Sequence, residues 1–288
     1  MARPQIKPDA SLPTRVLSSV VAGLILLGVV FEGRILFFLA LVAILVIGSL
    51  ELRGMLRNRG IELNMGFLLV GGVVMLLFSL PQLHDIYPGV PWREIALGLV
   101  LIGAFSNELI AGANIERFAY SLMSFLYLPW TLGFLLLLRH QPNSDIGLWV
   151  LTLPLLCSFA NDVGAYFVGR LFGRHKLAPN ISPGKTVEGS IGGIAVSFLV
   201  LWGYTNIMAN AYPGSPFALL DPLYLSIINL LLSFAAQLGD LTESMLKRYC
   251  GVKDSGSLLP GHGGLLDRLD SHLFTVPLTY YLLSLFLR

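Results

Sequence analysis

Apolar segments of roughly membrane-spanning length recur along the whole chain and restrict what it can fold into. A helix needs roughly 20 apolar residues to cross the hydrocarbon core of a bilayer. Of the 288 residues, 55% are hydrophobic and only 12% are charged, which is about half the charged share of a soluble domain. The sequence therefore predicts an all-α, polytopic membrane protein. The nine predicted spans cover residues 16–31, 35–52, 65–81, 95–112, 119–138, 146–171, 189–209, 219–246 and 271–287.

The positive charges are distributed unevenly between the two sides of this predicted bundle. With a cytoplasmic N-terminus, 15 of the 19 lysines and arginines fall in inner segments and 4 fall in outer ones. Such an excess is typical of cytoplasmic loops. We therefore predict that the N-terminus is cytoplasmic. We also divide the chain into residues 1–150, with about five spans, and residues 151–288, whose polar loops face the cytoplasm.

A polar block interrupts the apolar pattern near the C-terminus. Between Asp240 and Asp270 the chain carries five carboxylates, four fixed cations and one histidine within 31 residues. Apolar segments flank this block on both sides. Ionisable groups beside a bilayer are costly, so a cluster of this kind indicates a functional site.

The first part of the block places four polar residues on one helix face. Asp240, Glu243, Ser244 and Lys247 are spaced i, i+3, i+4 and i+7. A structural alternative is a solvated helix end, in which Glu243 and Lys247 form an i,i+4 pair. Asp240 fits this alternative less well, because it follows directly on an apolar run.

The second part is a glycine-rich turn, Pro260–Gly264, with His262 at its centre. Glycines let the backbone approach a ligand closely, and successive N–H groups can hold a phosphate. Asp267 and Asp270 follow at the expected start of the next helix. Either they stabilise the helix dipole there, or they ligate Mg²⁺ together with substrate phosphates. His262 has either a structural role or a role in binding.

Two further segments carry candidate polar groups. In the first, Ser182 is a suitable N-cap for the seventh span, and Lys185 beside a helix N-terminus favours anion binding. In the second, Asp162 lies within the sixth span, either as a site residue or as a buried acid paired with Asn161. We expect Glu108, in the fourth span, to pair with a neighbour or to lie at the membrane interface.

Together these features favour metal-assisted phosphoryl or nucleotidyl transfer at a cytoplasmic surface. A divalent ion would neutralise a polyphosphate, and the lysines and arginines would hold anionic groups. A transporter is a different possibility, but it would carry ionisable residues near the bilayer midplane in both halves of the chain. A membrane scaffold would not need the acid-rich block. Nothing in the sequence indicates a nucleic-acid partner.

The segment Ser244–Arg268 resembles the signature of the phosphatidate cytidylyltransferase (CDP-diacylglycerol synthase) family. That signature runs S-x-apolar-K-R, four residues, K-D, a short stretch that includes a small and an apolar residue, and then P-x-H-G-G-apolar-x-D-R, and the segment matches all of it. The similarity extends over roughly residues 157–272 and includes Ser182-Pro-Gly-Lys-Thr186. The first 150 residues are similar only in hydropathy.

The resemblance implies a homodimeric, multi-pass enzyme of the bacterial inner membrane, with its active site facing the cytoplasm. It would convert CTP and phosphatidate to CDP-diacylglycerol and pyrophosphate with Mg²⁺, and K⁺ is a candidate second ion. A neighbouring interpretation is a CTP-dependent lipid kinase, which would transfer the γ-phosphate and release CDP.

The resemblance also implies a role for each residue that matches the family pattern. The implied metal ligands are Asp240 and Asp267, with Asp162 and Asp270 close by. Lys247 and Arg268 join Asp240 and Asp267 as the implied catalytic residues. The implied substrate-binding residues are Ser182, Lys185, Thr186, Glu188, Ser244, Arg248, Lys253, Asp254, His262, Gly263 and Gly264.

Overall fold

The structure, a computed structural model, describes residues 28–33, 35–141, 144–256 and 263–286. Helices make up most of it, as the sequence predicts. The strands within these ranges are β1 (Lys176–Ala178) and β2 (Ser182–Thr186), which pair in an antiparallel hairpin. The helices are α2 (Ile35–Arg57), α3 (Met65–Leu77), α4 (Pro81–Ile86), α5 (Trp92–Ile110), α6 (Ile115–Tyr127), α7 (Pro129–His140), α8 (Ser144–Phe172), α9 (Val187–Ala211), α10 (Pro216–Leu219), α11 (Pro222–Tyr249), α12 (Leu266–Leu269) and α13 (His272–Phe286).

Within the described residues, five helical stretches are long and apolar enough to cross a membrane. They are Ile35–Arg57, Ile115–His140, Asp145–Phe172, Val187–Ala211 and Pro222–Tyr249. The predicted spans 35–52, 119–138, 146–171, 189–209 and 219–246 are therefore confirmed as apolar helices of membrane-spanning length.

Three of the other four predicted spans do not meet this criterion, and the described residues do not test the fourth. Predicted spans 65–81 and 271–287 correspond to α3 and α13, which have only 13 and 15 described residues. Span 95–112 corresponds to α5, which carries three charged side chains, Arg93, Glu94 and Glu108. Span 16–31 lies mostly outside the described residues.

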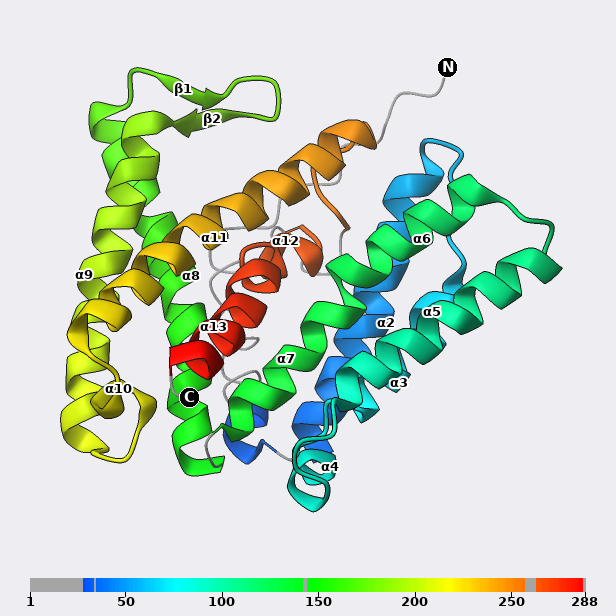
Figure 1. The fold of residues 1–288 in the computed structure, drawn as a ribbon. Helices are drawn as coiled ribbons and strands as arrows, with labels where there is room; N and C mark the ends of the chain where they lie inside the picture. The colour runs from blue at the N-terminus through cyan, green and yellow to red at the C-terminus, as the bar shows by residue number, and fades with distance from the viewer. Residues whose placement is uncertain (1–27, 34, 142–143, 257–262, 287–288) are drawn as a thin grey trace.

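Helices α8 and α9 form the most closely packed pair of the fold (Figure 1). Small residues allow this approach: a Cβ at Gly192 would lie 2.4 Å from Cβ of Val168, and one at Gly193 would lie 2.8 Å from the Asn161 carbonyl oxygen. Glycines in this segment therefore let the two helices pack closely. In Figure 1 the hairpin lies at one end of this pair and α10 at the other, while α11 crosses the pair and contacts α13.

The helix ends predicted to face the cytoplasm lie close together. Arg59, just after α2, donates to the carbonyl oxygen of Tyr249 at the end of α11, and its guanidinium lies 5.1 Å from the Tyr249 ring centroid. The hydroxyls of Tyr120 in α6 and Tyr249 are 2.7 Å apart. Far from these contacts, at the C-terminal end of α7, Arg139 Nε donates to the Val30 carbonyl oxygen at 2.7 Å. The loops at the end of α2, the start of α6 and the end of α11 therefore share one end of the bundle.

The segment before α9 differs from the prediction. Ser182 and Pro183 belong to strand β2, so Ser182 is not the N-cap of the helix. Thr186 takes this role, because its hydroxyl accepts a hydrogen bond from the Gly189 N–H at 3.1 Å. The pairing of Lys176 with Thr186 across the hairpin keeps the chain in an extended conformation up to Thr186, the N-cap. Lys185 therefore projects from a strand and not from a helix N-terminus.

Candidate active site

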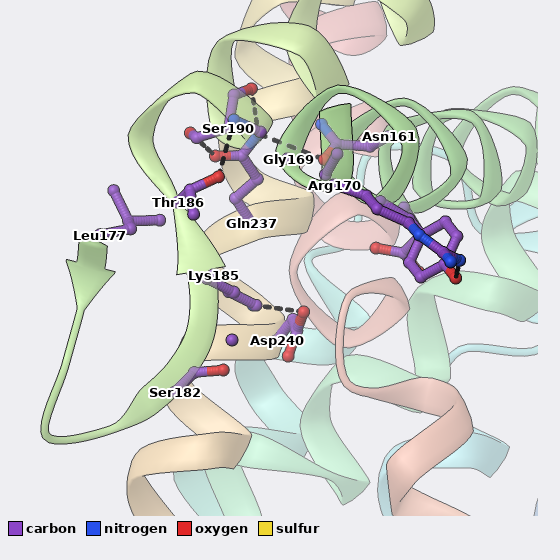
Figure 2. A pocket seen from close by; sticks show the side chains of 15 residues that line it. Asn161, Gly169, Arg170, Leu177, Ser182, Lys185, Thr186, Ser190, Gln237 and Asp240 are labelled. Carbon is purple, nitrogen blue, oxygen red and sulfur yellow. Dashed lines mark hydrogen bonds and ion pairs between the residues drawn. The ribbon is translucent and has the colours of Figure 1, made fainter. Parts of the chain in front are cut away.

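A polar cavity of about 530 Å³ lies where α8, β2, α9 and α11 meet (Figure 2). Asp162 and Tyr166 line it from α8, Ser182 and Lys185 from β2, and Asp240 from α11. Gly169 of α8 also lines the cavity, and because glycine has no side chain it leaves this space open. The structure thus brings together residues from the three separate segments that the sequence singles out.

Lys185 and Asp240 form the central charged contact of this cavity. Their side chains make an ion pair between Lys185 Nζ and Asp240 Oδ2, as Figure 2 shows. Both side chains are about one-quarter exposed, at 27%. The other Asp240 oxygen, Oδ1, lies 3.4 Å from the Ser244 hydroxyl, one turn further along α11. Ser244 is therefore placed beside the cavity, as the shared helix face predicts.

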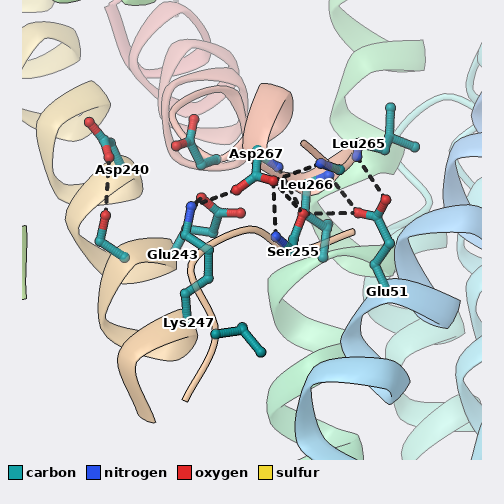
Figure 3. A network of polar contacts seen from close by, with 12 residues as sticks. Glu51, Asp240, Glu243, Lys247, Ser255, Leu265, Leu266 and Asp267 are labelled. Carbon is teal, nitrogen blue, oxygen red and sulfur yellow. Dashed lines mark hydrogen bonds and ion pairs between the residues drawn. The ribbon is translucent and has the colours of Figure 1, made fainter. Parts of the chain in front are cut away.

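A second charged cluster follows on the same helix face (Figure 3). Lys247 Nζ lies 2.7 Å from Glu243 Oε2 and 2.6 Å from Asp267 Oδ1. The Glu243 side chain is fully buried, and that of Lys247 is only 12% exposed. The expected i,i+4 pair is therefore present, but it is buried and includes Asp267, so a solvated helix end is the wrong description.

Asp267 is held by neutral donors as well as by Lys247. Its Oδ2 accepts from the N–H of Gly264 at 2.7 Å, and from the N–H and hydroxyl of Ser255 at 2.9 and 3.0 Å. Burial alone would raise the pKa of Asp267, but the hydrogen bonds from Lys247, Gly264 and Ser255 lower it below its usual value. The carboxylate is therefore kept ionised and in one orientation.

Asp270 lies in a different electrostatic environment from Asp267. Burial, together with the negative charges of Asp240 and Asp162, raises its pKa to about 7. Its Oδ1 accepts from the Ser271 N–H at 2.6 Å, which opposes this shift. Carboxylates that repel one another in a buried site would be stabilised in their charged forms by a bound cation.

The oxygen donors fit Mg²⁺ only as an ion shared with substrate. Among the described residues, no three carboxylate, histidine or cysteine side chains form a group that holds a metal ion by themselves. Mg²⁺ normally takes one or two carboxylates and completes its shell with water and substrate phosphates. Asp240, with Asp162 and Asp270 near it, offers such a partial oxygen shell beside the cavity.

Gly239 allows α11 to approach the backbone that carries Asp270. A Cβ at this position would lie 2.5 Å from the Asp270 carbonyl oxygen and 2.9 Å from Ser271 Cα. We expect Gly239→Ala to destabilise the protein by about 1–3 kcal/mol, because overpacking displaces the backbone. Gly203→Ala is the matched control, since a Cβ there meets nothing within 4 Å. Thermal unfolding in detergent tests this, and equal midpoints for the two variants would contradict it.

Most of the other predicted site residues lie outside the cavity lining. Glu188 accepts from the N–H groups of Arg174 and His175, at 3.0 and 3.2 Å, and so anchors the loop before β1. Arg248 Nε donates to the Ile181 carbonyl oxygen at 3.2 Å and ties α11 to the hairpin. Three of the remaining predicted residues, Lys253, Asp254 and Arg268, are exposed. Thr186 lines the cavity, and Gly263 has a positive φ. His262 lies outside the described residues.

Sequence reasoning did not identify two groups of polar residues at the site. Gln237 donates to the Asn161 side-chain oxygen at 3.2 Å and to the Ser190 carbonyl oxygen at 2.9 Å, so it joins α8, α9 and α11 beside the cavity. Its position one turn before Asp240, within an apolar run, is the sequence feature that could have indicated its place at the site. The second group is Glu51 in α2, which contacts the backbone beside Asp267.

Comparisons with known proteins assign the chain to a family. The sequence model of the cytidylyltransferase family matches residues 13–286. The chain belongs to the cytidylyltransferase family. This confirms the resemblance drawn from Ser244–Arg268, and the match also includes most of the first 150 residues.

Bacterial relatives are similar over nearly their whole length. The chain is 36% identical to a phosphatidate cytidylyltransferase of Bacillus subtilis, covering 94% of this chain and 97% of that protein. It is 34% identical to one of Synechocystis, covering 96% and 98% of the two chains. For one of Staphylococcus saprophyticus the identity is 35%, with 94% and 99% covered.

Proposed function

We propose that this protein transfers CMP from CTP to phosphatidate in the cavity beside Lys185 and Asp240, forming CDP-diacylglycerol for phospholipid synthesis. The observation that carries this proposal is that residues of the family signature lie next to residues that line the cavity. Asp240 lines the cavity. Lys247 lies on the same face of α11, and it contacts Asp267 of the short helix α12. The names of the full-length relatives supply the substrates.

The chemistry needs no nucleophile from the protein. A phosphate oxygen of phosphatidate forms a bond to the α-phosphorus of CTP. The bond from that phosphorus to the bridging oxygen breaks, and pyrophosphate leaves with the electron pair. Lys185 and Lys247 each hold an ammonium group against a carboxylate at the site, so each is placed to contact phosphate oxygens instead.

Mg²⁺ is the proposed cofactor, with K⁺ as a candidate second ion. Asp240 and Asp267 would hold it, with Asp162 and Asp270 close by. Bound there, it would neutralise charge on the polyphosphate and on the leaving pyrophosphate. Before substrate binds, Lys185 and Lys247 neutralise the same two carboxylates. Arg268 and Lys253 would add positive charge for the phosphates.

The proposed setting is the bacterial inner membrane, with nine spans, a cytoplasmic N-terminus and the active site on the cytoplasmic side. The uneven distribution of lysines and arginines supports this orientation. The shared position of the Arg59 and Tyr249 segments at one end of the bundle supports it further. The division at residue 150 and a homodimeric assembly remain proposals as well.

The position of the transferred label distinguishes this reaction from lipid kinase activity. Detergent-purified protein is incubated with phosphatidate and CTP labelled at either the α- or the γ-phosphate, with Mg²⁺ or with EDTA. We expect label in the chloroform phase only from α-labelled CTP and only with Mg²⁺. Lipid label from γ-labelled CTP would instead indicate a kinase, and transfer from neither position would remove the proposed function.

A further inference from the structure

Glu51 links the N-terminal half of the chain to the active site. It is the one acidic residue of helix α2, more than 200 positions before the segment that it contacts. Its Oε1 accepts from the Leu265 N–H at 2.8 Å, and its Oε2 accepts from the Leu266 N–H at 2.9 Å and from the Ser255 hydroxyl at 3.1 Å (Figure 3). Both carboxylate oxygens are therefore engaged by the chain around Asp267.

Two glycines leave space for this carboxylate. A Cβ at Gly256 would lie 2.4 Å from Glu51 Oε1, and one at Gly264 would lie 2.7 Å from Glu51 Oε2. Any larger residue at either position would push the carboxylate away from the backbone. The glycines of the family signature thus permit a contact with a helix that lies outside the signature.

The Ser255 hydroxyl couples Glu51 to Asp267. Its oxygen lies 3.1 Å from Glu51 Oε2 and 3.0 Å from Asp267 Oδ2. One hydroxyl proton cannot be donated fully to both carboxylates, so the two oxygens share it. In addition, Gly264, whose N–H donates to Asp267, directly precedes Leu265, whose N–H donates to Glu51. A displacement of Glu51 therefore changes both the donors and the position of Asp267.

We propose that Glu51 is a positioning residue of the active site, which orients Asp267 through Ser255 and the Gly264–Leu266 backbone. This inference rests on the proposed role of Asp267 as a metal ligand. It assigns α2 a part in catalysis, although the family signature lies entirely in the C-terminal half. Charge-assisted hydrogen bonds from backbone N–H groups to a carboxylate are strong enough to fix a loop in one orientation.

The direct test is Glu51→Gln, which keeps the size of the side chain but removes the charge and one acceptor oxygen. Glu62→Gln, in an exposed position after the same helix, is the matched control. We expect Glu51→Gln to raise the half-saturating Mg²⁺ concentration or to lower kcat by about 10- to 100-fold, as is typical for groups that orient a metal ligand. The KM for CTP at saturating Mg²⁺ is expected to stay close to that of the parent protein.

A binding measurement provides a readout independent of turnover. Mn²⁺ is titrated into the detergent-purified full chain and free Mn²⁺ is followed by electron paramagnetic resonance, with Asp267→Asn as reference. We expect Glu51→Gln to weaken Mn²⁺ binding in the same direction as Asp267→Asn. Parent-like Mn²⁺ affinity and Mg²⁺ dependence in Glu51→Gln would overturn the positioning role, whatever its thermal stability. If Asp267→Asn itself leaves Mn²⁺ binding unchanged, the proposed metal role of Asp267 fails instead.

Ser255→Ala keeps the inference testable if Glu51→Gln does not fold. This variant removes the hydroxyl shared by the two carboxylates and leaves both charges in place. We expect it to weaken Mn²⁺ binding and to raise the required Mg²⁺ concentration, by a smaller factor than Glu51→Gln. Parent-like behaviour of Ser255→Ala in both measurements would show that the coupling does not exist.

Discussion

Asp267→Asn is expected to reduce the rate of CMP transfer by roughly 10²- to 10³-fold, the usual cost of losing one electrostatic group at a reacting centre. Both carboxylate oxygens of Asp267 accept hydrogen bonds, one from Lys247 and the other from Ser255 and Gly264. Asparagine offers only one acceptor oxygen, so its NH2 group would face one of these sets of donors and could not accept from it. The variant also removes the negative charge that would hold Mg²⁺.

The measurement is kcat with phosphatidate and CTP across a Mg²⁺ titration, in detergent-purified protein. Glu116→Gln, an exposed acid in the first turn of α6, is the control and is expected to behave like the parent protein. Thermal unfolding of each variant separates a loss of catalysis from a loss of fold. Full activity of Asp267→Asn at every Mg²⁺ concentration would remove Asp267 from the proposed metal site.

Much of the site could be predicted because its residues lie on regular elements. Asp240, Ser244 and Lys247 share a face of α11 through helical spacing alone. The structure places Ser244 beside Asp240, and Lys247 beside Glu243. Asp162 lines the same cavity as Asp240, from α8. The expected pairing of Glu108 is also confirmed, since Arg117 lies 2.6 Å from it.

Contacts between distant segments could not be predicted in this way. The ion pair of Lys185 with Asp240 depends on how the hairpin folds over α11, and no periodicity relates the two positions. The contact between Glu51 and Leu266 spans 215 positions and depends on the packing of α2 beside the C-terminal loops. The prediction of Ser182 as an N-cap was wrong because strand pairing with β1 extends the chain up to Thr186.

The apolar pattern predicted helices better than it predicted spans. Hydropathy alone does not distinguish a membrane helix from a short apolar helix covered by its neighbours. In α3, Leu68, Met75 and Leu76 are buried within the protein, so much of its apolar surface faces other helices. An apolar segment that is satisfied by internal packing therefore need not have the full length of a span.

Lys247→Ala is expected to cause the largest loss of stability. The ammonium group of Lys247 contacts both Glu243, whose side chain is fully buried, and Asp267. Removing one partner of a buried ion pair costs about 3–5 kcal/mol, because the remaining charge stays in a medium of low polarity. We therefore expect a clear drop in the unfolding midpoint of the detergent-purified protein, together with loss of CMP transfer.

A double variant separates the cost of the uncompensated charge from the lost contacts. Glu243→Gln combined with Lys247→Met removes both charges and fills most of the space, so the stability should recover part of the loss seen in Lys247→Ala. Transfer activity should not recover, since Asp267 would still lack the lysine that neutralises it before substrate binds. Equal unfolding midpoints for the parent, the single variant and the double variant would mean that Lys247 does not stabilise this buried site. Recovered activity in the double variant would mean that Lys247 acts only on stability.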